Sequence, residues 1–254
     1  MSKINDRVAV VTGATGGIGF EVAKRLGNDG FTVVLNGIED QAGADRLAEL
    51  TALGITAEYR GFDVTDENAV TSNINAIGEK YGKIDVLVNN AGGLGGRSRF
   101  EEMTTEFYRF VMALNLDSTF FASRAAIPFL KKSDYASIIN YTSNAGWNAG
   151  GPGAGIYGTS KAGVHAITRA LAKDLAEYGI RVNAVSPGTI DTPFHAQIKA
   201  TKPEVFASWK NNIMLGRLGQ PEDIAGVVSF LAGKDAAFMT AETIQIGGGQ
   251  ALGI

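Results

Sequence analysis

A short apolar run, a glycine-rich turn and an amphipathic stretch near the start of the chain constrain its fold more than any other feature. Residues 8–11 are apolar and rich in valine, as in a strand buried on both faces of a parallel sheet. The turn Thr12-Gly13-Ala14-Thr15-Gly16-Gly17-Ile18-Gly19 follows, and the apolar spacing over residues 20–26 predicts a helix. In this order, backbone N–H groups and a helix N-terminus face a phosphate. The glycine spacing is a variant of the commoner Gly-x-Gly-x-x-Gly, and its context favours a pyrophosphate loop over a plain tight turn.

The alternation of strand and helix continues along the chain. Strands are predicted at residues 8–11, 32–35, 57–61, 84–88, 137–141, 182–185 and 243–246, and further helices at 42–53, 69–81, 108–130, 156–178 and 221–231. Repeated strand-then-helix units with right-handed crossovers give a parallel sheet with helices on both faces. No linker interrupts the pattern, so we predict an α/β fold: one Rossmann-type, doubly wound domain over residues 1–254, with about seven parallel strands. Residues 188–215 break the rhythm, which is typical of a lid over an active site.

Composition excludes several classes of function. A hydrophobic content of 45% over 254 residues indicates a globular protein with a sizeable core, and a net charge of −3 offers no basic surface to nucleic acid or an anionic membrane. The absence of cysteine excludes disulfides and thiolate chemistry, and with His165 and His195 as the only histidines we expect no metal site. Residues 1–7 have no apolar signal core and no apolar run is long enough to span a bilayer, so a cytoplasmic location is expected.

Tyr157 and Lys161 are the first candidates for chemistry. They lie four residues apart, so on the predicted helix at 156–178 they share one face. An ammonium near a phenol favours the phenolate and lowers its pKa from about 10, which makes the tyrosine a usable acid or base. Ser143, just upstream, offers a hydroxyl to a substrate oxygen. Because Tyr-x-x-x-Lys is also common on exposed helix faces, its weight comes from the surrounding motifs.

Four predicted strand ends carry distinctive residues. Asp63 follows the third strand and could accept a hydrogen bond from an adenine amino group, and Asn89-Asn90-Ala91-Gly92 closes the fourth strand. Ser143 follows the fifth strand and Pro187-Gly188 the sixth. Each is also a common turn former. Ligands of such sheets bind beyond the carboxyl ends of the strands, so four such ends beside the glycine turn predict one site.

These motifs stand in a known order: Thr12-Gly13-x-x-x-Gly17-x-Gly19, Asn89-Asn90-Ala91-Gly92, Ser143, Tyr157-x-x-x-Lys161 and Pro187-Gly188-x-x-x-Thr192. Over essentially its whole length the chain resembles the short-chain dehydrogenase/reductase family. The resemblance implies an NAD(P)(H)-dependent oxidoreductase that interconverts a carbonyl and an alcohol by hydride transfer. It implies that Tyr157 passes the proton and Ser143 polarises the carbonyl. Lys161 would bind the nicotinamide ribose and lower the Tyr157 pKa, and Asn115 would hold a water in the proton relay. The implied cofactor-binding residues are Gly13, Thr15, Gly17, Ile18, Gly19, Asn36, Gly37, Asp63, Val64, Asn90, Ala91, Gly92, Tyr157, Lys161, Pro187, Gly188, Ile190 and Thr192.

Positions beside the turn and the second strand bear on the choice of cofactor. NADP-dependent members of the family usually carry Arg or Lys just after the second strand or before the second turn glycine, and these positions are Ile38 and Gly16. NAD-dependent members usually have an acid at the end of the second strand, where this chain has Asn36-Gly37 with Glu39 close behind. Because Glu39 would repel a 2′-phosphate, the sequence favours NAD(H), with NADP(H) as the alternative.

The segments that border the expected site bear on the class of substrate. Reductases of acyl carrier protein substrates tend to carry basic residues where the acidic partner docks, and the matching positions are Asp134 and Tyr178. A closer local resemblance, over residues 89–97, 150–157 and 186–196, is to bacterial reductases of 4-deoxy-L-erythro-5-hexoseulose uronate, a product of alginate breakdown. Reduction of a keto sugar acid is therefore the leading hypothesis. The alternatives are the same chemistry on another ketone, a steroid, a polyol or a 3-oxoacyl thioester, and a dinucleotide-sensing regulator without turnover. Such regulators usually lose the Tyr or Lys of the active pair, which this chain keeps.

Two further residues are candidates for binding the substrate together with Ser143 and Tyr157. Arg97, at the mouth of the expected site, suits a substrate carboxylate because a guanidinium can pair with it through two hydrogen bonds. His195, in the lid, could donate to a substrate hydroxyl or carboxylate. The alternative for each is a solvent-facing side chain.

The chain departs from the family pattern in two places, and the family also implies an assembly. Ser143 and Tyr157 are 14 positions apart, one more than expected, so the loop between them should bulge at its glycines. Ile246-Gly247-Gly248-Gly249 lacks the acid usually found before the glycine pair. The resemblance implies a homotetramer, or a homodimer, in which long helices pair between subunits.

Overall fold

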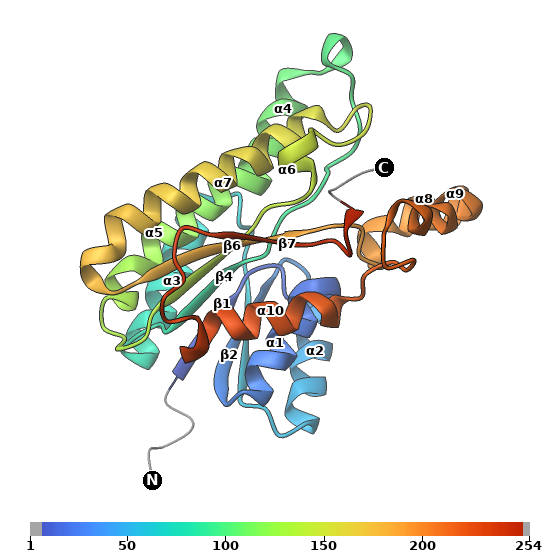
Figure 1. Cartoon of the computed structure of the whole chain (residues 1–254). Coiled ribbons are helices and arrows are strands. Elements are labelled where there is room, and N and C mark those ends of the chain that lie inside the picture. The colour runs from blue at the N-terminus through green and yellow to red at the C-terminus, as the bar shows by residue number, and fades with distance from the viewer. Residues whose placement is uncertain (1–6, 251–254) are drawn as a thin grey trace.

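The computed structural model describes residues 7–250 and contains a seven-stranded sheet between two layers of helices (Figure 1). Every strand pairing is parallel and the spatial order is β3-β2-β1-β4-β5-β6-β7, which confirms the predicted doubly wound, Rossmann-type fold in a single domain. The strands are β1 (Arg7–Val11), β2 (Phe31–Gly37), β3 (Ala57–Gly61), β4 (Val86–Asn89), β5 (Ser137–Tyr141), β6 (Arg181–Pro187) and β7 (Thr243–Ile246).

Three helices cover each face of the sheet. One face carries α1 (Gly17–Asn28), α2 (Asp40–Ala52) and α10 (Pro221–Ala232), and the other carries α3 (Glu67–Tyr81), α5 (Ser118–Leu130) and α7 (Gly155–Leu175). The remaining helices are α4 (Thr105–Met112), α6 (Ala145–Asn148), α8 (Ala196–Thr201) and α9 (Pro203–Ser208), a π-helical turn at Ala113–Asp117, and 3₁₀ turns at Phe100–Glu102, Ala176–Tyr178, Pro193–His195, Trp209–Asn212 and Lys234–Ala236.

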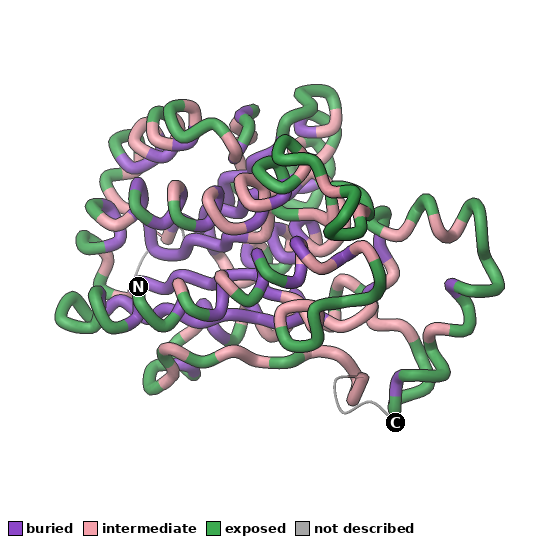
Figure 2. Tube along the Cα trace, turned by 90° about the horizontal axis from the view of Figure 1, so that it is seen from above, coloured by how far each residue is buried: buried purple, intermediate pink, exposed green. Residues whose placement is uncertain are grey.

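The sheet divides the core into two apolar layers. Buried residues run through the middle of the molecule, and most exposed residues lie around them (Figure 2). Successive side chains of a strand point to opposite faces, so Ala9 and Val11 pack under α1 and α10 while Val8 and Val10 face α3 and α5. Leu26 of α1 and Ile74 of α3 are fully buried in these layers. Each such side chain stabilises the fold by roughly 1.5–3 kcal/mol relative to exposure. This packing fixes the carboxyl ends of β1, β4, β5 and β6 side by side.

The predicted helix at 108–130 is interrupted where the structure has a π-helical turn between α4 and α5. The side chain of Asn115 enters this turn, and its Nδ2 donates to the carbonyl of Val111 at 2.9 Å. A side chain inserted into the helical ladder is a recognised cause of such a bulge. Apolar periodicity alone carries no signal for it.

The segment predicted as an irregular lid contains two short helices, α8 and α9, which stand out from the two layers (Figure 1). The short helix α6 was not predicted, and β6 is longer than expected, with seven residues instead of four. Between α6 and α7 the loop bulges as expected, with positive φ angles at Ala149, Gly150 and Gly153.

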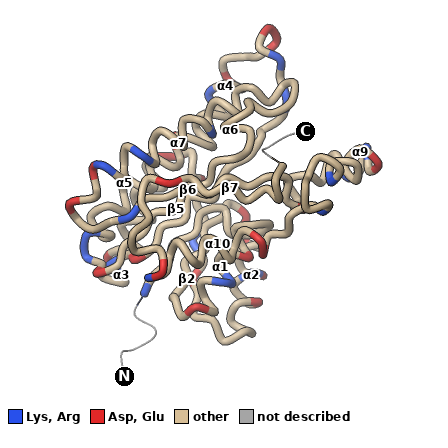
Figure 3. The backbone as a smooth tube through the Cα atoms, in the orientation of Figure 1, with Lys and Arg blue, Asp and Glu red and all other residues tan. Residues whose placement is uncertain are grey.

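Charged residues in the described part of the chain are distributed over both helix layers, and Figure 3 shows both signs interspersed along the backbone. Among residues 7–250 there is no helix that is both long enough and apolar enough to cross a membrane. The prediction about the start of the chain concerns residues 1–7, of which residues 1–6 lie outside the described part of the structure, as do residues 251–254.

Candidate active site

The glycine-rich turn is held in shape by the end of β4. Asn90 donates through Nδ2 to the carbonyls of Thr12 and Gly13, each at 2.9 Å, and its backbone N–H donates to Thr12 Oγ1 at 3.1 Å. Gly13 has a φ of 62°, in the left-handed region that favours glycine. A Cβ atom on Gly19 would lie 2.3 Å from the carbonyl oxygen of Gly13, so only glycine fits there. The two motifs therefore form one rigid unit.

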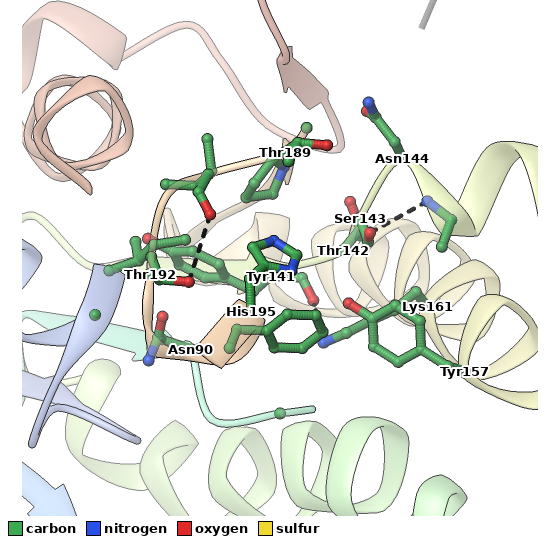
Figure 4. A pocket seen from close by; sticks show the side chains of 18 of the residues that line it. Asn90, Tyr141, Thr142, Ser143, Asn144, Tyr157, Lys161, Thr189, Thr192 and His195 are labelled. Atoms are coloured by element: carbon green, nitrogen blue, oxygen red, sulfur yellow. Dashed lines mark hydrogen bonds between the residues drawn. The ribbon is translucent and has the colours of Figure 1, made fainter. Parts of the chain in front are cut away.

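A cavity of about 580 Å³ runs from this turn along the carboxyl ends of β4, β5 and β6 (Figure 4). Its wall includes fourteen of the residues predicted for the site: Gly13, Gly17, Ile18, Gly19, Asn90, Gly92, Ser143, Tyr157, Lys161, Pro187, Gly188, Ile190, Thr192 and His195. A Cβ on Gly16 would meet no atom within 4 Å, so the backbone of the turn is open on that side. The N-terminus of α1, with these exposed backbone groups, fits the pyrophosphate of a dinucleotide.

Ser143, Tyr157 and Lys161 lie together in the wall of the cavity (Figure 4). Ser143 follows β5, and its Oγ accepts a hydrogen bond from the backbone N–H of Ala145 at 3.1 Å. Tyr157 and Lys161 project from the first turns of α7. The Lys161 side chain is 3% exposed, and its Nζ donates to the carbonyl of Tyr141 at 2.9 Å. The ammonium thus reaches back to β5 beneath the tyrosine.

Burial decides the protonation of this pair. It raises the pKa of Tyr157, and the hydrogen bond with Ser143 lowers that pKa by less. Burial also lowers the pKa of Lys161 to about 8. The expected lowering of the Tyr157 pKa by Lys161 is therefore wrong for this structure. Its physical reason is that Nζ lies 5.9 Å from the centre of the Tyr157 ring, while loss of water disfavours the charged form of both groups.

Asn115 lies behind the cavity wall rather than in it. Its amide pairs with the backbone of Gly93, donating at 2.8 Å and accepting at 3.0 Å, and the side chain is completely buried. A Cβ on Gly92 would lie 2.7 Å from Asn115 Oδ1 and 2.9 Å from Lys161 Nζ. Asn115 and Lys161 therefore flank Gly92 from two sides.

Several predicted cofactor residues do not line the cavity: Thr15, Asn36, Gly37, Asp63, Val64 and Ala91. Asn36 is buried and links the turn to the segment after β3. Its Oδ1 accepts from the N–H of Gly13 at 3.3 Å, and its Nδ2 donates to the carbonyl of Phe62 at 2.9 Å. Asp63 is exposed, and one of its carboxylate oxygens accepts from the N–H and the hydroxyl of Thr65, both at 2.8 Å. Asn36 and Gly37 end β2 and Asp63 and Val64 follow β3, so these four lie at the β2–β3 edge, the side expected for adenosine.

The two candidate substrate residues differ in position. Arg97 does not line the cavity: it is exposed, and its Nη1 donates to the carbonyl of Pro152 at 2.8 Å, beside the glycine loop that forms the rim. His195 does line it (Figure 4). Its ring packs within 5.6 Å, centre to centre, of Phe194, Phe206 and Trp209. Burial is the main cause of the lowered pKa of His195.

Sequence reasoning missed other parts of the wall. Asn144 directly follows Ser143, and the glycine pair at 150–151 lies inside the segment 150–157, so their place in the sequence was a signal for them. Phe194, which directly follows Pro193, lies inside the segment 186–196 and so had the same kind of signal. Gln250 comes from the C-terminal segment beyond β7 and had no such signal. Within the described residues, 7–250, no group of three or more His, Cys, Asp or Glu side chains is arranged to hold a metal ion.

The sequence matches known proteins over nearly its whole length. The family model described as "Enoyl-(Acyl carrier protein) reductase" matches residues 13–251. A diacetyl reductase [(S)-acetoin forming] of Staphylococcus aureus is 37% identical over 254 residues, covering 96% of this chain and 98% of that protein. The chain belongs to the short-chain dehydrogenase/reductase family. It is accordingly an NAD(P)-dependent oxidoreductase that acts on CH–OH and C=O groups.

Solved structures match over nearly the whole fold. A putative gluconate dehydrogenase from Agrobacterium tumefaciens superposes with a TM-score of 0.92 at 29% identity, covering 99% of this chain and 98% of the other. A single-site variant of the actinorhodin polyketide ketoreductase, solved with NADPH, superposes with a TM-score of 0.91 at 34% identity, covering 96% of this chain and 97% of the other.

Proposed function

We propose that the protein reduces the carbonyl group of a keto sugar acid, such as 4-deoxy-L-erythro-5-hexoseulose uronate, with NADH as the preferred reductant. The observation that carries the chemistry is the placement of Ser143, Tyr157 and Lys161 in the wall of one cavity that has the glycine turn at its other end. Regulators that sense a dinucleotide without turnover usually lack the Tyr or the Lys of this set. The presence of both in this chain therefore argues against such a regulator.

In this proposal Ser143 and Tyr157 donate hydrogen bonds to the carbonyl oxygen of the substrate. Because burial raises its pKa, Tyr157 holds its proton at neutral pH and can give it to the oxygen as negative charge develops there. Lys161 supplies a buried positive charge beside the ribose position. A nicotinamide dinucleotide, when bound, supplies the hydride for reduction and accepts it in the reverse reaction.

The turn at residues 13–19 would hold the pyrophosphate, and Pro187, Gly188, Ile190 and Thr192 the nicotinamide end. Preference for NAD(H) is supported by the end of β2, where Ile38 is 72% exposed and Glu39 is an exposed acid. A 2′-phosphate placed there would meet a negative charge. Arg46, which donates to the carbonyl of Thr15, is already paired with Glu49 at 2.7 Å.

The rest of the cavity wall suits a substrate with several hydroxyl groups. Asn144, Asn148 and His195 bring neutral polar side chains, and among the described residues Lys161 is the one lysine, arginine or acid in the wall. The three segments that resemble uronate reductases all contribute to this wall or its rim. The similarity to a putative gluconate dehydrogenase is a second, independent pointer to sugar acids. Diacetyl is the second candidate, because the chain is 37% identical to a diacetyl reductase.

Initial rates of NADH and NADPH oxidation with the keto-uronate, diacetyl and an acetoacetyl thioester test the proposal. We expect kcat/KM for the uronate to exceed that for the other two by at least tenfold, and NADH to be used better than NADPH. Faster turnover of diacetyl or the thioester would leave the reaction class in place and refute the sugar-acid assignment. Better use of NADPH would refute the cofactor assignment.

Arg97 is proposed to pair with the substrate carboxylate at the rim. Among the described residues, the one hydrogen bond of its side chain joins Nη1 to the carbonyl of Pro152, and a guanidinium has five donors in all. We expect Arg97→Ala to raise KM for the uronate by about 3–10-fold, as for one charge-assisted contact in a solvated rim, and to leave KM for uncharged diacetyl unchanged. Arg99→Ala, at an exposed position in the same loop, is the matched control. An unchanged KM for the uronate in Arg97→Ala would rule out pairing between Arg97 and the substrate carboxylate.

Residues 188–215 are proposed as a lid, because Phe194 and His195 enter the cavity wall from this segment. A homotetramer, or a homodimer, and a cytoplasmic location are also proposed. Exposed aromatic side chains on α4 and α5, among them Phe110 and Phe120, support pairing of the long helices between subunits. A monomer in sedimentation analysis would refute the assembly.

A further inference from the structure

Gln250 occupies a position that no catalytic motif explains. It follows β7 and the glycine run at 247–249, where Gly248 and Gly249 have φ angles of 58° and 86° and turn the chain back toward the sheet. Its backbone N–H donates to the carbonyl of Gly247 at 2.9 Å. The half-buried side chain thereby reaches the wall of the catalytic cavity, on the side formed by the exit of β6.

The carboxamide of Gln250 forms a two-point contact with Thr189. Its Oε1 accepts from the Thr189 backbone N–H at 2.8 Å, and its Nε2 donates to Thr189 Oγ1 at 2.9 Å. The carbonyl of Thr189 in turn accepts from the N–H of Gly219 at 3.0 Å. The peptide groups on both sides of Thr189 are therefore fixed by hydrogen bonds, and Gln250 supplies one of the two fixed points.

The same carboxamide lies against Gly188 and the turn that carries Ser143. A Cβ on Gly188 would come within 2.7 Å of Gln250 Oε1 and 3.2 Å of Asn144 Nδ2, so glycine leaves room for both amides. Asn144 Nδ2 also approaches Gln250 Oε1 at 3.5 Å. The backbone N–H of Asn144 donates to the carbonyl of Pro187 at 3.1 Å. The C-terminal segment, the β6 exit and the Ser143 turn thus meet at one point.

We infer that Gln250 is a positioning residue for the nicotinamide end of the cofactor site, acting through Thr189 on Gly188 and Ile190 and through Asn144 on the Ser143 turn. The inference rests on the proposed assignment of these residues to that end of the site. Without the carboxamide, the N–H of Thr189 loses its hydrogen-bond partner, and residues 188–190 become more mobile. The glycine turn at residues 13–19 is held separately by Asn90, so the adenosine end keeps its geometry.

The test compares two ligands that share the adenosine end: NADH and ADP-ribose, which lacks nicotinamide. Calorimetric titration of Gln250→Ala is expected to show NADH binding weakened about 5–10-fold and ADP-ribose binding within about twofold of the unchanged protein. For Gln250→Glu we expect an NADH affinity between those of Gln250→Ala and the unchanged protein, because a carboxylate still accepts from the Thr189 N–H and hydroxyl. Gln245→Ala, an exposed glutamine on the neighbouring strand β7, is the matched control and should change neither affinity.

Unchanged NADH affinity in Gln250→Ala would overturn the inference. Equal weakening of NADH and ADP-ribose would also overturn it, because it would show a general structural role. Neither binding measurement needs a substrate, so a failure of the uronate assignment leaves this test standing. If the unchanged protein prefers NADPH, the same comparison is made between NADPH and 2′-phospho-ADP-ribose.

Discussion

Replacing Tyr157 with phenylalanine is expected to lower kcat by about 10³-fold or more in both directions of the reaction while NADH affinity changes by less than about threefold. A positioned acid–base group contributes on the order of 10²–10⁴ to the rate, and this substitution removes its proton. The phenyl ring keeps the contact with Phe194, whose ring centre lies 6.4 Å from that of Tyr157. Initial rates and NADH titration measure the two effects. Tyr178→Phe, at an exposed tyrosine outside the cavity, is the control.

The pH dependence of the unchanged enzyme tests the same assignment. Burial raises the pKa of Tyr157 above its usual value near 10, so the phenol stays protonated through neutral pH. Reduction, which uses the protonated form, should be nearly independent of tyrosine ionisation between about pH 6 and 9. Oxidation of the alcohol product uses the phenolate and should rise about tenfold per pH unit from about pH 7 to 9. A plateau in oxidation from about pH 7 would show that the phenol ionises near neutrality, as the sequence alone had suggested.

The fold was predictable because its five central strands, β2, β1, β4, β5 and β6, are buried on both faces. Such strands are rich in apolar residues. The strand predicted at 8–11 lies within β1, and the strand predicted at 137–141 coincides with β5. The interruption at Asn115 was not predictable from apolar periodicity, because it arises from a polar side chain bonded inside the helix. The short helix α6 has too few residues to show a period of its own.

The candidate site was predictable where neighbouring residues in the sequence form it. Tyr157 and Lys161 share a helix, and the glycine turn is one continuous segment. The contact between Asn144 and Gln250 joins positions 106 residues apart and depends on how β7 ends. Arg97 was expected at the cavity mouth, and its place at the rim is set by Pro152, whose carbonyl accepts its hydrogen bond. The direction of the Tyr157 pKa depends on burial, which follows only from the assembled fold.

Replacing Lys161 with methionine is expected to abolish turnover and, at the same time, to raise the melting temperature at pH 7. The ammonium is 3% exposed, and its pKa of about 8 against an ordinary 10.5 corresponds to a cost of about 3 kcal/mol for keeping the charge in the folded protein. Losing the hydrogen bond to the carbonyl of Tyr141 offsets about 1 kcal/mol of the gain. A net gain of about 2 kcal/mol corresponds to a rise of roughly 5 °C in a protein of this size.

The sign of this effect can be checked with pH. Below about pH 8 the lysine is charged in both the folded and the unfolded protein, so the folded state carries the full cost of burying the charge. Between about 8 and 10.5 the unfolded chain binds a proton that the folded protein has released, so the stability of the unchanged protein rises with pH. The advantage of Lys161→Met should therefore be largest at neutral pH and vanish before pH 10.5, where the lost hydrogen bond leaves the variant less stable by about 1 kcal/mol. Lys173→Met, at an exposed position of the same helix, should show no such trend. A Lys161→Met variant less stable than the unchanged protein at pH 7 would show that the ammonium stabilises the fold, and that its contacts outweigh the loss of water.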